Sequence, residues 1–243
     1  LASSDNMFVR INAGHPMVTK VKGRENRYQI VCGMFAHELG HVLYTDFLAA
    51  QTHANYLGSG RWYPYPPDLK TTADARNEKA FWNYVRTDPK NLEMVQMIAH
   101  YISNVIEDGY IENRVLNNFP GTLGYGLEKL RERHFEQILT VTQLIEQEDE
   151  ESHIFESILQ IMLSYAKFGE IKYGDEPLSD ERIQAVFGLI TDIDSALMSR
   201  SGKDRLNVVN MVLVKCWDYI ESFCEECKKR QEEAIASGGS ASL

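Results

Sequence analysis

The chain has 243 residues, of which 44% are hydrophobic and 25% are charged, a composition that excludes a disordered or fibrous protein. Its formal net charge is -10 at pH 7. This charge argues against a nucleic-acid partner, because binding to a phosphate backbone requires clustered Lys and Arg side chains. We therefore expect a soluble globular protein that acts on, or binds to, something other than DNA or RNA.

The sequence also predicts a cytoplasmic location with no membrane partner. No stretch approaches the roughly 18 to 20 consecutive apolar residues of a membrane-spanning helix, and the N-terminal residues lack the pattern of a signal peptide. The four cysteines are too few and too unevenly spaced for a disulfide framework. Residues 236–243 are mostly Ser, Gly and Ala, which predicts a flexible linker or tail.

The first third of the chain is predicted to contain a hairpin, a long helix and a loop. Two β-like runs at 7–12 and 17–21, separated by a turn at 13–16, favour a small hairpin or edge strand. From about 25 to 55, apolar residues recur every three or four positions, which indicates one helix. Three prolines in 58–70 exclude a helix interior and favour an extended aromatic loop.

The remaining two thirds are predicted to be helical, so that the fold class is mainly α with little sheet. The stretches with helical periodicity are 72–86, 91–118, 127–147, 153–168, 180–200 and 205–236. Pro120-Gly121 ends the helix 91–118. The segment 120–125 is therefore the best candidate for a junction between two lobes, 1–118 and 119–235, which we expect to pack together as one domain.

The long helix 25–55 carries the pattern His-Glu-x-x-His at residues 37–41. Residues four apart on a helix lie about 40° apart on one face, so His37 and His41 can hold one metal ion. Glu38 lies one step around the helix and can reach a water molecule at that metal. Gly40 costs about 1 kcal/mol in a helix interior relative to Ala, which indicates that another element approaches closely. Asp46 is expected to be a cap or a polar contact.

The third metal ligand is expected in the acidic part of the helix 91–118. On a helical wheel, Asp108 and Glu112 fall on the apolar face. A carboxylate buried there needs a cation or several donors, because burying an isolated charge is very costly. The wheel favours Asp108 as the ligand, with Glu112 orienting a histidine through its other ring nitrogen. Glu107 is the second possibility, since it has the longer reach and shares a row with His100 and Asn104.

These motifs resemble a known family of domains. The matching residues are His37-Glu38-Leu39-Gly40-His41, Thr45-Asp46-Phe47 and Glu107-Asp108-Gly109-Tyr110-Ile111-Glu112. Together they are similar to the HExxH zinc metallopeptidase domains that precede von Willebrand factor A domains in bacterial proteins, and more distantly to cobalt-chelatase T-subunit-like proteins. The resemblance covers about residues 7–118. It implies a zincin-like metallopeptidase core at 1–118, with a small N-terminal β hairpin or edge strands, and a C-terminal helical lobe at 119–235.

The resemblance also implies a ligand set and an activity. In gluzincins the third zinc ligand is a Glu on a later helix, often followed by an Asp four residues on. This pattern favours Glu107 as the ligand, with Asp108 as the alternate. The sequence departs from the pattern at position 111, which is Ile where the family often has Asp. One zinc ion would then be held by His37, His41 and Glu107, with Glu38 as general base in the hydrolysis of peptide bonds. Asp108, Glu112 and Asn104 are expected to lie behind the metal ligands and to orient them. His100 or Tyr110 is expected to contact the oxyanion or the substrate.

A second interpretation belongs to a different class of protein. The chain could be a non-catalytic helical scaffold or adaptor that works with a von Willebrand factor A domain in the same full-length chain and with an AAA+ ATPase. Retention of Glu38 favours the peptidase, since an inert relative is free to lose its general base. Four other histidines, at 15, 53, 134 and 153, are interpreted as surface or satisfied polar residues, and the Cys224 and Cys227 pair as a chance spacing.

Overall fold

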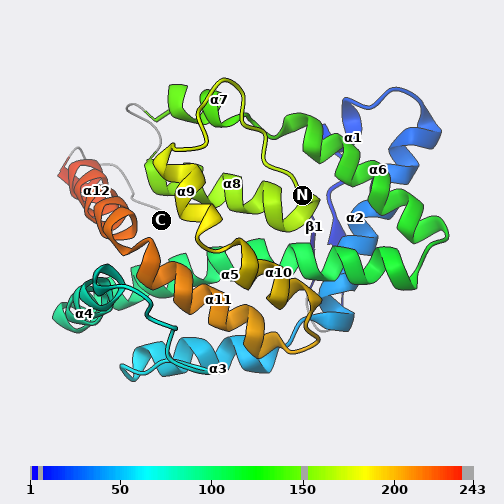
Figure 1. Cartoon of the computed structure of the whole chain (residues 1–243). Coiled ribbons are helices and arrows are strands. Elements are labelled where there is room, and N and C mark those ends of the chain that lie inside the picture. Colours follow the sequence, from blue (N-terminus) through cyan, green and yellow to red (C-terminus); the bar gives the residue numbers. More distant parts are fainter. Residues whose placement is uncertain (1, 5–7, 149–152, 237–243) are drawn as a thin grey trace.

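The computed structural model describes residues 2–4, 8–148 and 153–236, and the predicted tail at 236–243 lies almost entirely outside them. Within these segments the chain forms twelve helices and one two-stranded sheet, which confirms the mainly α fold class (Figure 1). The helices are α1 (Pro16–Thr19), α2 (Arg24–Tyr44), α3 (Phe47–Gly58), α4 (Thr72–Thr87), α5 (Pro89–Asn118), α6 (Thr122–Gln137), α7 (Val141–Glu146), α8 (Ile154–Phe168), α9 (Glu181–Phe187), α10 (Ile190–Met198), α11 (Gly202–Lys215) and α12 (Trp217–Ala236).

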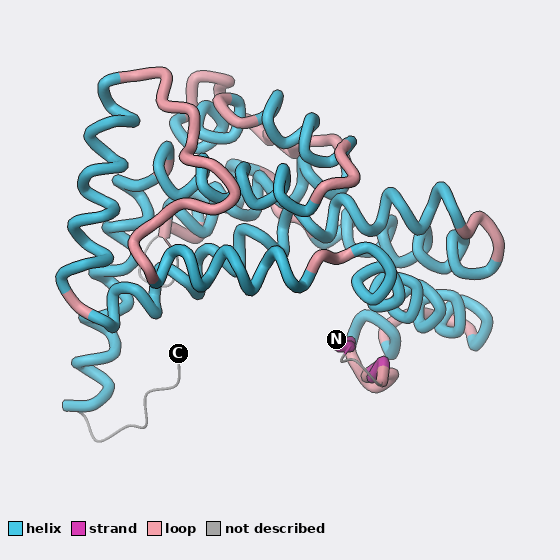
Figure 2. Tube along the Cα trace, turned by 90° about the horizontal axis from the view of Figure 1, so that it is seen from below, coloured by secondary structure: helices cyan, strands magenta, loops and turns pink. Residues whose placement is uncertain are grey.

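The N-terminal strands differ from the predicted pair. β1 (Ala2–Ser4) pairs in antiparallel fashion with β2 (Val9–Ile11). The first predicted strand, 7–12, is therefore the second strand of the observed pair. The second predicted strand, 17–21, is wrong, because α1 occupies most of it. His15 accepts a hydrogen bond from the backbone nitrogen of Met17, and Pro16 occupies the first helical turn, where its missing N–H costs nothing. Figure 2 shows both strands at the edge of the helical assembly.

The long helix predicted from 25 to 55 is two helices. α2 ends at Tyr44, and α3 begins after Asp46, whose carboxylate accepts a hydrogen bond of 2.9 Å from the backbone nitrogen of Ala49. The expectation that Asp46 is a cap is therefore confirmed. The loop that follows α3 is non-helical through residue 71, as its prolines predicted.

Several later helices are also shorter than predicted. The stretch 127–147 divides into α6 and α7, because Thr140 and Gln143 form a capping box that starts a new helix. The stretch 180–200 divides into α9 and α10, and 205–236 into α11 and α12. By contrast, α4, α5 and α8 match the predicted stretches closely.

The helix α5 is the centre of the fold and packs against α2, α4, α6, α8, α10 and α11 (Figure 1). The buried hydrophobic side chains form two clusters. The larger one joins α5 to helices from both halves of the chain, including Trp217 at the start of α12. The smaller one joins α1, α2 and α6 to Val115, near the end of α5. The division into lobes at residue 118 stays a prediction, and α5 contributes to both clusters.

Two further features concern the helices and the cysteines of the described segments. None of the helices in the described segments combines the length and the apolar character that a bilayer crossing requires. All four cysteines are unpaired, and Cys216 and Cys224 are buried.

Candidate metal centre

His37 and His41 lie on the same face of α2, one turn apart, as their spacing predicted. This face is turned toward α5. A β-carbon added to Gly40 would lie 3.1 Å from side-chain atoms of both Ile111 and Val115, closer than ordinary van der Waals contact. The glycine therefore allows α2 to pack tightly on α5, which brings the two imidazoles over the acidic part of that helix.

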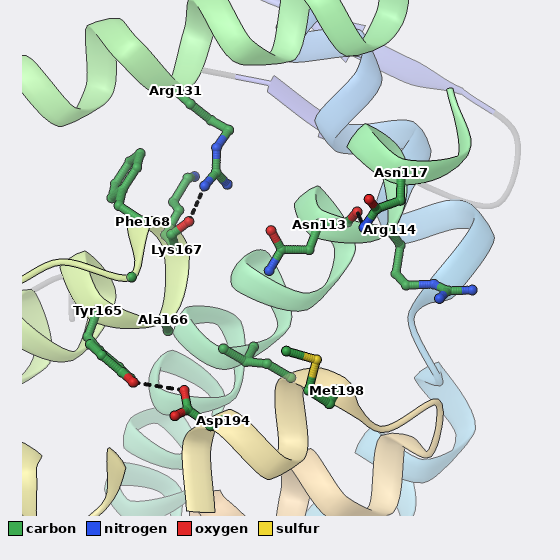
Figure 3. Close-up of a pocket in the computed structure, with 12 residues that line it drawn as sticks. Asn113, Arg114, Asn117, Arg131, Tyr165, Ala166, Lys167, Phe168, Asp194 and Met198 are labelled. Atoms are coloured by element: carbon green, nitrogen blue, oxygen red, sulfur yellow. Dashed lines mark hydrogen bonds between the residues drawn. The ribbon is translucent and has the colours of Figure 1, made fainter. Parts of the chain in front are cut away.

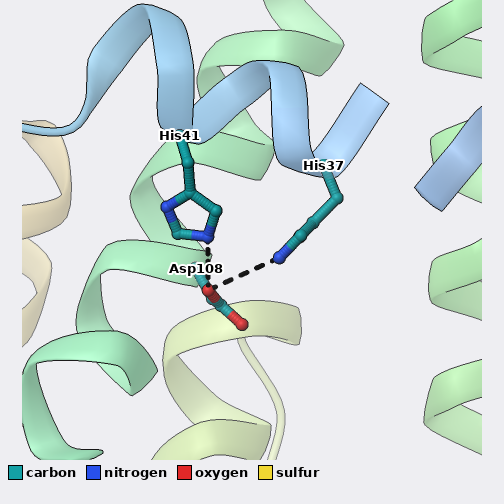
Figure 4. A group of neighbouring side chains, drawn as sticks. All are labelled: His37, His41 and Asp108. Carbon is teal, nitrogen blue, oxygen red and sulfur yellow. Dashed lines mark ion pairs between the residues drawn. The ribbon is translucent and has the colours of Figure 1, made fainter. Parts of the chain in front are cut away.

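Asp108 of α5 points toward both imidazoles (Figure 4). Its Oδ1 atom lies 3.2 Å from Nε2 of His41 and 3.7 Å from Nε2 of His37. Among the described residues, these three side chains form the group whose ligand atoms all lie within 4.8 Å of one another. Two ligand atoms on a tetrahedral zinc ion, with bonds of roughly 2.1 Å, are about 3.4 Å apart. The spacing of the Asp108 oxygen from each imidazole is thus suited to a shared metal ion.

Both histidines are oriented by hydrogen bonds at their other ring nitrogen. Nδ1 of His37 lies 2.9 Å from Oε1 of Glu112, and Nδ1 of His41 lies 3.0 Å from the hydroxyl oxygen of Thr45. A carboxylate only accepts, so Glu112 fixes the tautomer of His37 and leaves its Nε2 lone pair for a metal, while Thr45 holds the His41 ring in place. Two imidazoles and one carboxylate therefore have the chemistry and the orientation of a three-residue metal site.

Glu112 lies where the helical wheel placed it, behind His37, and its side chain is fully buried. Two cations bind its carboxylate: the Lys167 ammonium at 2.8 Å and the Arg131 guanidinium at 2.6 Å. Burial by itself raises the pKa of Glu112, but the charge of Lys167 and the hydrogen bond from His37, together with Arg131, lower it well below its usual range. The carboxylate is therefore ionised at neutral pH and can accept from the His37 ring.

No motif or spacing in the sequence pointed to Lys167 and Arg131. They come from α8 and α6, far from the motif in sequence, and reach Glu112 only because the helices pack closely. A β-carbon at Gly109 would overlap the backbone oxygen of Ala166, so α8 can approach α5 only because position 109 is glycine. Gly109, directly after Asp108, was the available sequence signal for such a crossing.

The charges around the site also shift the pKa of two of the candidate ligands. Burial lowers the pKa of His37, but the hydrogen bond to Glu112 and the nearby carboxylate of Asp108 outweigh burial and raise it above the ordinary value. Burial raises the pKa of Asp108, but the hydrogen bond from His41 and the charges of His37 and Lys167 outweigh burial and lower it. Asp108 is thus held as a carboxylate, the form that binds a metal.

Glu107 does not take part in this group, which corrects the preference for it as third ligand. Its carboxylate pairs with Arg205 of α11, with Oε2 at 2.5 Å from Nε and Oε1 at 3.3 Å from Nη2. The Arg205 guanidinium also lies 3.6 Å above the ring centre of Tyr110, which is buried. Adjacent residues on a helix point about 100° apart, so Glu107 faces α11 while Asp108 faces α2. The structure reverses the order of the two candidates, and it buries Tyr110 beneath Arg205.

His100 and Asn104 lie further along α5. Nδ2 of Asn104 is 3.2 Å from Nε2 of His100, so these two side chains contact each other and do not support the candidate ligands from behind, as Asn104 was expected to do. Both line a small cavity of about 100 Å³ that His41 also borders. His100 thus lies on the His41 side of the site, twelve residues before Glu112 on α5.

A larger cavity of about 370 Å³ opens on the other side of the group. It is bordered by His37, Glu38 and Asp108, and therefore reaches both the candidate ligands and the residue expected to act as base. Glu38 is itself buried. The remaining lining residues are His15, Met17, Met34, Leu130, His134, Gln137 and Lys167.

A third cavity, of about 460 Å³, lies between α5, α6, α8 and α10 and includes none of the three candidate ligands. Figure 3 shows the Arg131 guanidinium donating a hydrogen bond to the backbone oxygen of Lys167 in this cavity, and the Tyr165 hydroxyl donating to Asp194. Arg131 and Lys167 therefore border this space and also hold Glu112.

The other histidines have partners outside the metal group. His15 and His153 cap α1 and α8, and His53 is buried with Nε2 at 2.8 Å from Oδ1 of Asn210, which confirms it as a satisfied polar residue. His134 borders the 370 Å³ cavity, which the sequence did not indicate. Cys224 and Cys227 are not part of the metal group found among the described residues.

No family model, no curated protein and no solved structure matches this chain. The similarity to HExxH metallopeptidase domains therefore rests on the motif residues alone.

Proposed function

We propose that the chain is a zinc-dependent metallopeptidase-like domain that hydrolyses peptide bonds, with Glu38 as general base. The observation that carries this proposal is the convergence of Nε2 of His37, Nε2 of His41 and Oδ1 of Asp108 beside a cavity that Glu38 borders. Three protein ligands leave one position open on a tetrahedral ion, which is the arrangement of catalytic rather than structural zinc sites.

The choice of zinc follows from the donor set. Imidazole nitrogen together with one carboxylate suits zinc, whereas calcium and magnesium prefer oxygen ligands only. A zinc ion in this position supplies a Lewis acid that acidifies water and polarises a carbonyl group. In this proposal Asp108 is the third metal ligand, the role for which the family resemblance favoured Glu107. The proposal retains a zincin-like core.

The protein's own residues have separate roles in this reaction. His37, His41 and Asp108 would bind the ion, while Glu112 and Thr45 keep the two rings in place. Glu38 would accept a proton from the attacking water and deliver it to the nitrogen of the leaving amine. His100, which borders the small cavity next to His41, would be available to contact the substrate on that side.

The adaptor interpretation is the alternative, and one observation favours it. Six large apolar side chains are exposed on α2 and α3: Tyr28, Phe35, Val42, Leu43, Phe47 and Leu48. Exposed large apolar side chains can contribute to protein-interaction surfaces. A von Willebrand factor A domain and an AAA+ ATPase are the partners that the resemblance implies for such a surface.

The two functions can be separated with one variant. Purified wild type and Glu38→Gln are loaded with zinc, their zinc content is measured, and both are incubated with a peptide library. We expect about one zinc ion per chain in both proteins and cleavage by wild type only, with a loss of at least about 100-fold in Glu38→Gln. Zinc binding without any Glu38-dependent cleavage would refute the peptidase proposal and favour the adaptor.

A further inference from the structure

We propose that the 370 Å³ cavity binds an apolar side chain of the substrate, from the residue next to the bond that is cleaved. This inference rests on the proposed function and adds a substrate class to it. The cavity shares His37, Glu38 and Asp108 with the candidate metal centre. A side chain in the cavity therefore has its backbone close to the metal and to Glu38.

The size and the walls of the cavity suit a large apolar side chain. Its apolar lining comes from Met17 of α1, Met34 of α2 and Leu130 of α6, which are all buried. Methionine side chains are flexible and polarisable, so they can adapt to aliphatic or aromatic guests. A cavity of 370 Å³ lies within the range of small-ligand sites, and it exceeds what Gly or Ala would fill.

The charged residues of the lining include Lys167, Glu38 and Asp108, and all three belong to the candidate metal centre or to the ion pairs beside it. Lys167 presents a positive charge, and its ammonium group is already bound to Glu112 at 2.8 Å. With zinc bound, Asp108 would be occupied as a ligand and Glu38 would be needed as the base, so a lysine or arginine side chain would give up its hydration beside the Lys167 ammonium with only the base left to pair with. Burial and the charge of Lys167 lower the pKa of His134 to about 4, so that side chain is neutral at pH 7 and adds no charge to attract an acidic guest.

The experiment observes the cavity directly and does not depend on turnover. The protein is labelled with ¹³C at the methionine methyl groups and titrated with N-acetyl-phenylalanine amide, N-acetyl-lysine amide and N-acetyl-glycine amide, in the zinc-loaded and the metal-free forms. We expect saturable shifts of the Met17 and Met34 methyl signals with the phenylalanine probe. The lysine and glycine probes should bind at least roughly tenfold more weakly.

A matched pair of variants tests the location. Gln137 and Glu136 are neighbours near the end of α6, both exposed, but only Gln137 borders the cavity. Gln137→Trp should obstruct the cavity and abolish the shifts, whereas Glu136→Trp should leave them unchanged. Both substitutions are on the surface and should not prevent folding.

The outcomes distinguish this inference from the proposed function. Absence of Met17 and Met34 shifts in zinc-loaded protein would overturn the inference, as would equal binding of the lysine probe or equal effects of the two variants. Shifts with the expected selectivity in a protein that binds no zinc would support an apolar binding site and would contradict the peptidase proposal.

Discussion

Replacement of Glu112 by Gln tests whether the buried charge network holds the site together. The substitution keeps the size of the side chain, so it creates no cavity. It leaves Lys167, itself buried, and Arg131 without the carboxylate that both bind, at 2.8 and 2.6 Å. Removal of one partner from a buried ion pair typically costs about 3–5 kcal/mol. For a chain of this size, that loss corresponds to a melting temperature lower by roughly 6–20 °C.

The assay is urea unfolding with EDTA present, so that metal binding does not contribute to stability. The pH dependence supplies a second test. The pKa of Glu112 is lower in the folded protein than the ordinary 4.5, so its contribution is fully present above that pH and is lost as the pH falls below it. We therefore expect the difference between wild type and Glu112→Gln to be largest near neutral pH and to shrink below about pH 4.5. The exposed Glu136→Gln is the control.

Two results would refute this reasoning. One is a difference of less than about 1 kcal/mol at pH 7, which would show that the network is not a source of stability. The other is a large difference that does not change between pH 7 and pH 3, which would show that the effect does not come from the ionised carboxylate.

Three further substitutions test other parts of the structure. Glu107→Gln should destabilise the protein by about 3–5 kcal/mol, because Arg205 is buried, but should leave zinc affinity unchanged; unfolding and zinc titration measure the two effects. Gly109→Ala should cost at least about 1–3 kcal/mol and weaken zinc binding, because the new methyl group would overlap the backbone of Ala166; unchanged values for both would contradict the close packing of α5 and α8. Asn210→Leu removes three hydrogen bonds of a buried side chain, two of them to the loop before α4, and should cost roughly 2–4 kcal/mol, with faster hydrogen exchange in that loop.

The parts of the site that depend on helix geometry could be predicted from the sequence. The spacing of His37 and His41 placed both rings on one face, and the helical wheel of 91–118 placed Asp108 and Glu112 together on another. The wheel favoured Asp108, while the analogy with gluzincins favoured Glu107. Since neighbouring residues on a helix point in different directions, the local geometry was the better guide here.

The parts that depend on tertiary packing could not be predicted. Lys167 and Arg131 have no spacing that links them to Glu112, and their positions follow from how α6 and α8 pack on α5. The same holds for Arg205, whose pairing with Glu107 could be found only once α11 was placed. Some helix ends, in contrast, were signalled locally: Thr140 and Gln143 have the spacing of a capping box, and that spacing divides the stretch 127–147 in the structure.

The central claim is that Asp108, and not Glu107, completes a metal site with His37 and His41. The most direct test is the zinc content of purified wild type, Asp108→Ala and Glu107→Gln after dialysis against a low concentration of zinc. We predict about one zinc ion per chain in wild type and Glu107→Gln, and a large loss in Asp108→Ala. Zinc retained in Asp108→Ala and lost in Glu107→Gln, or no zinc in wild type, would contradict the claim.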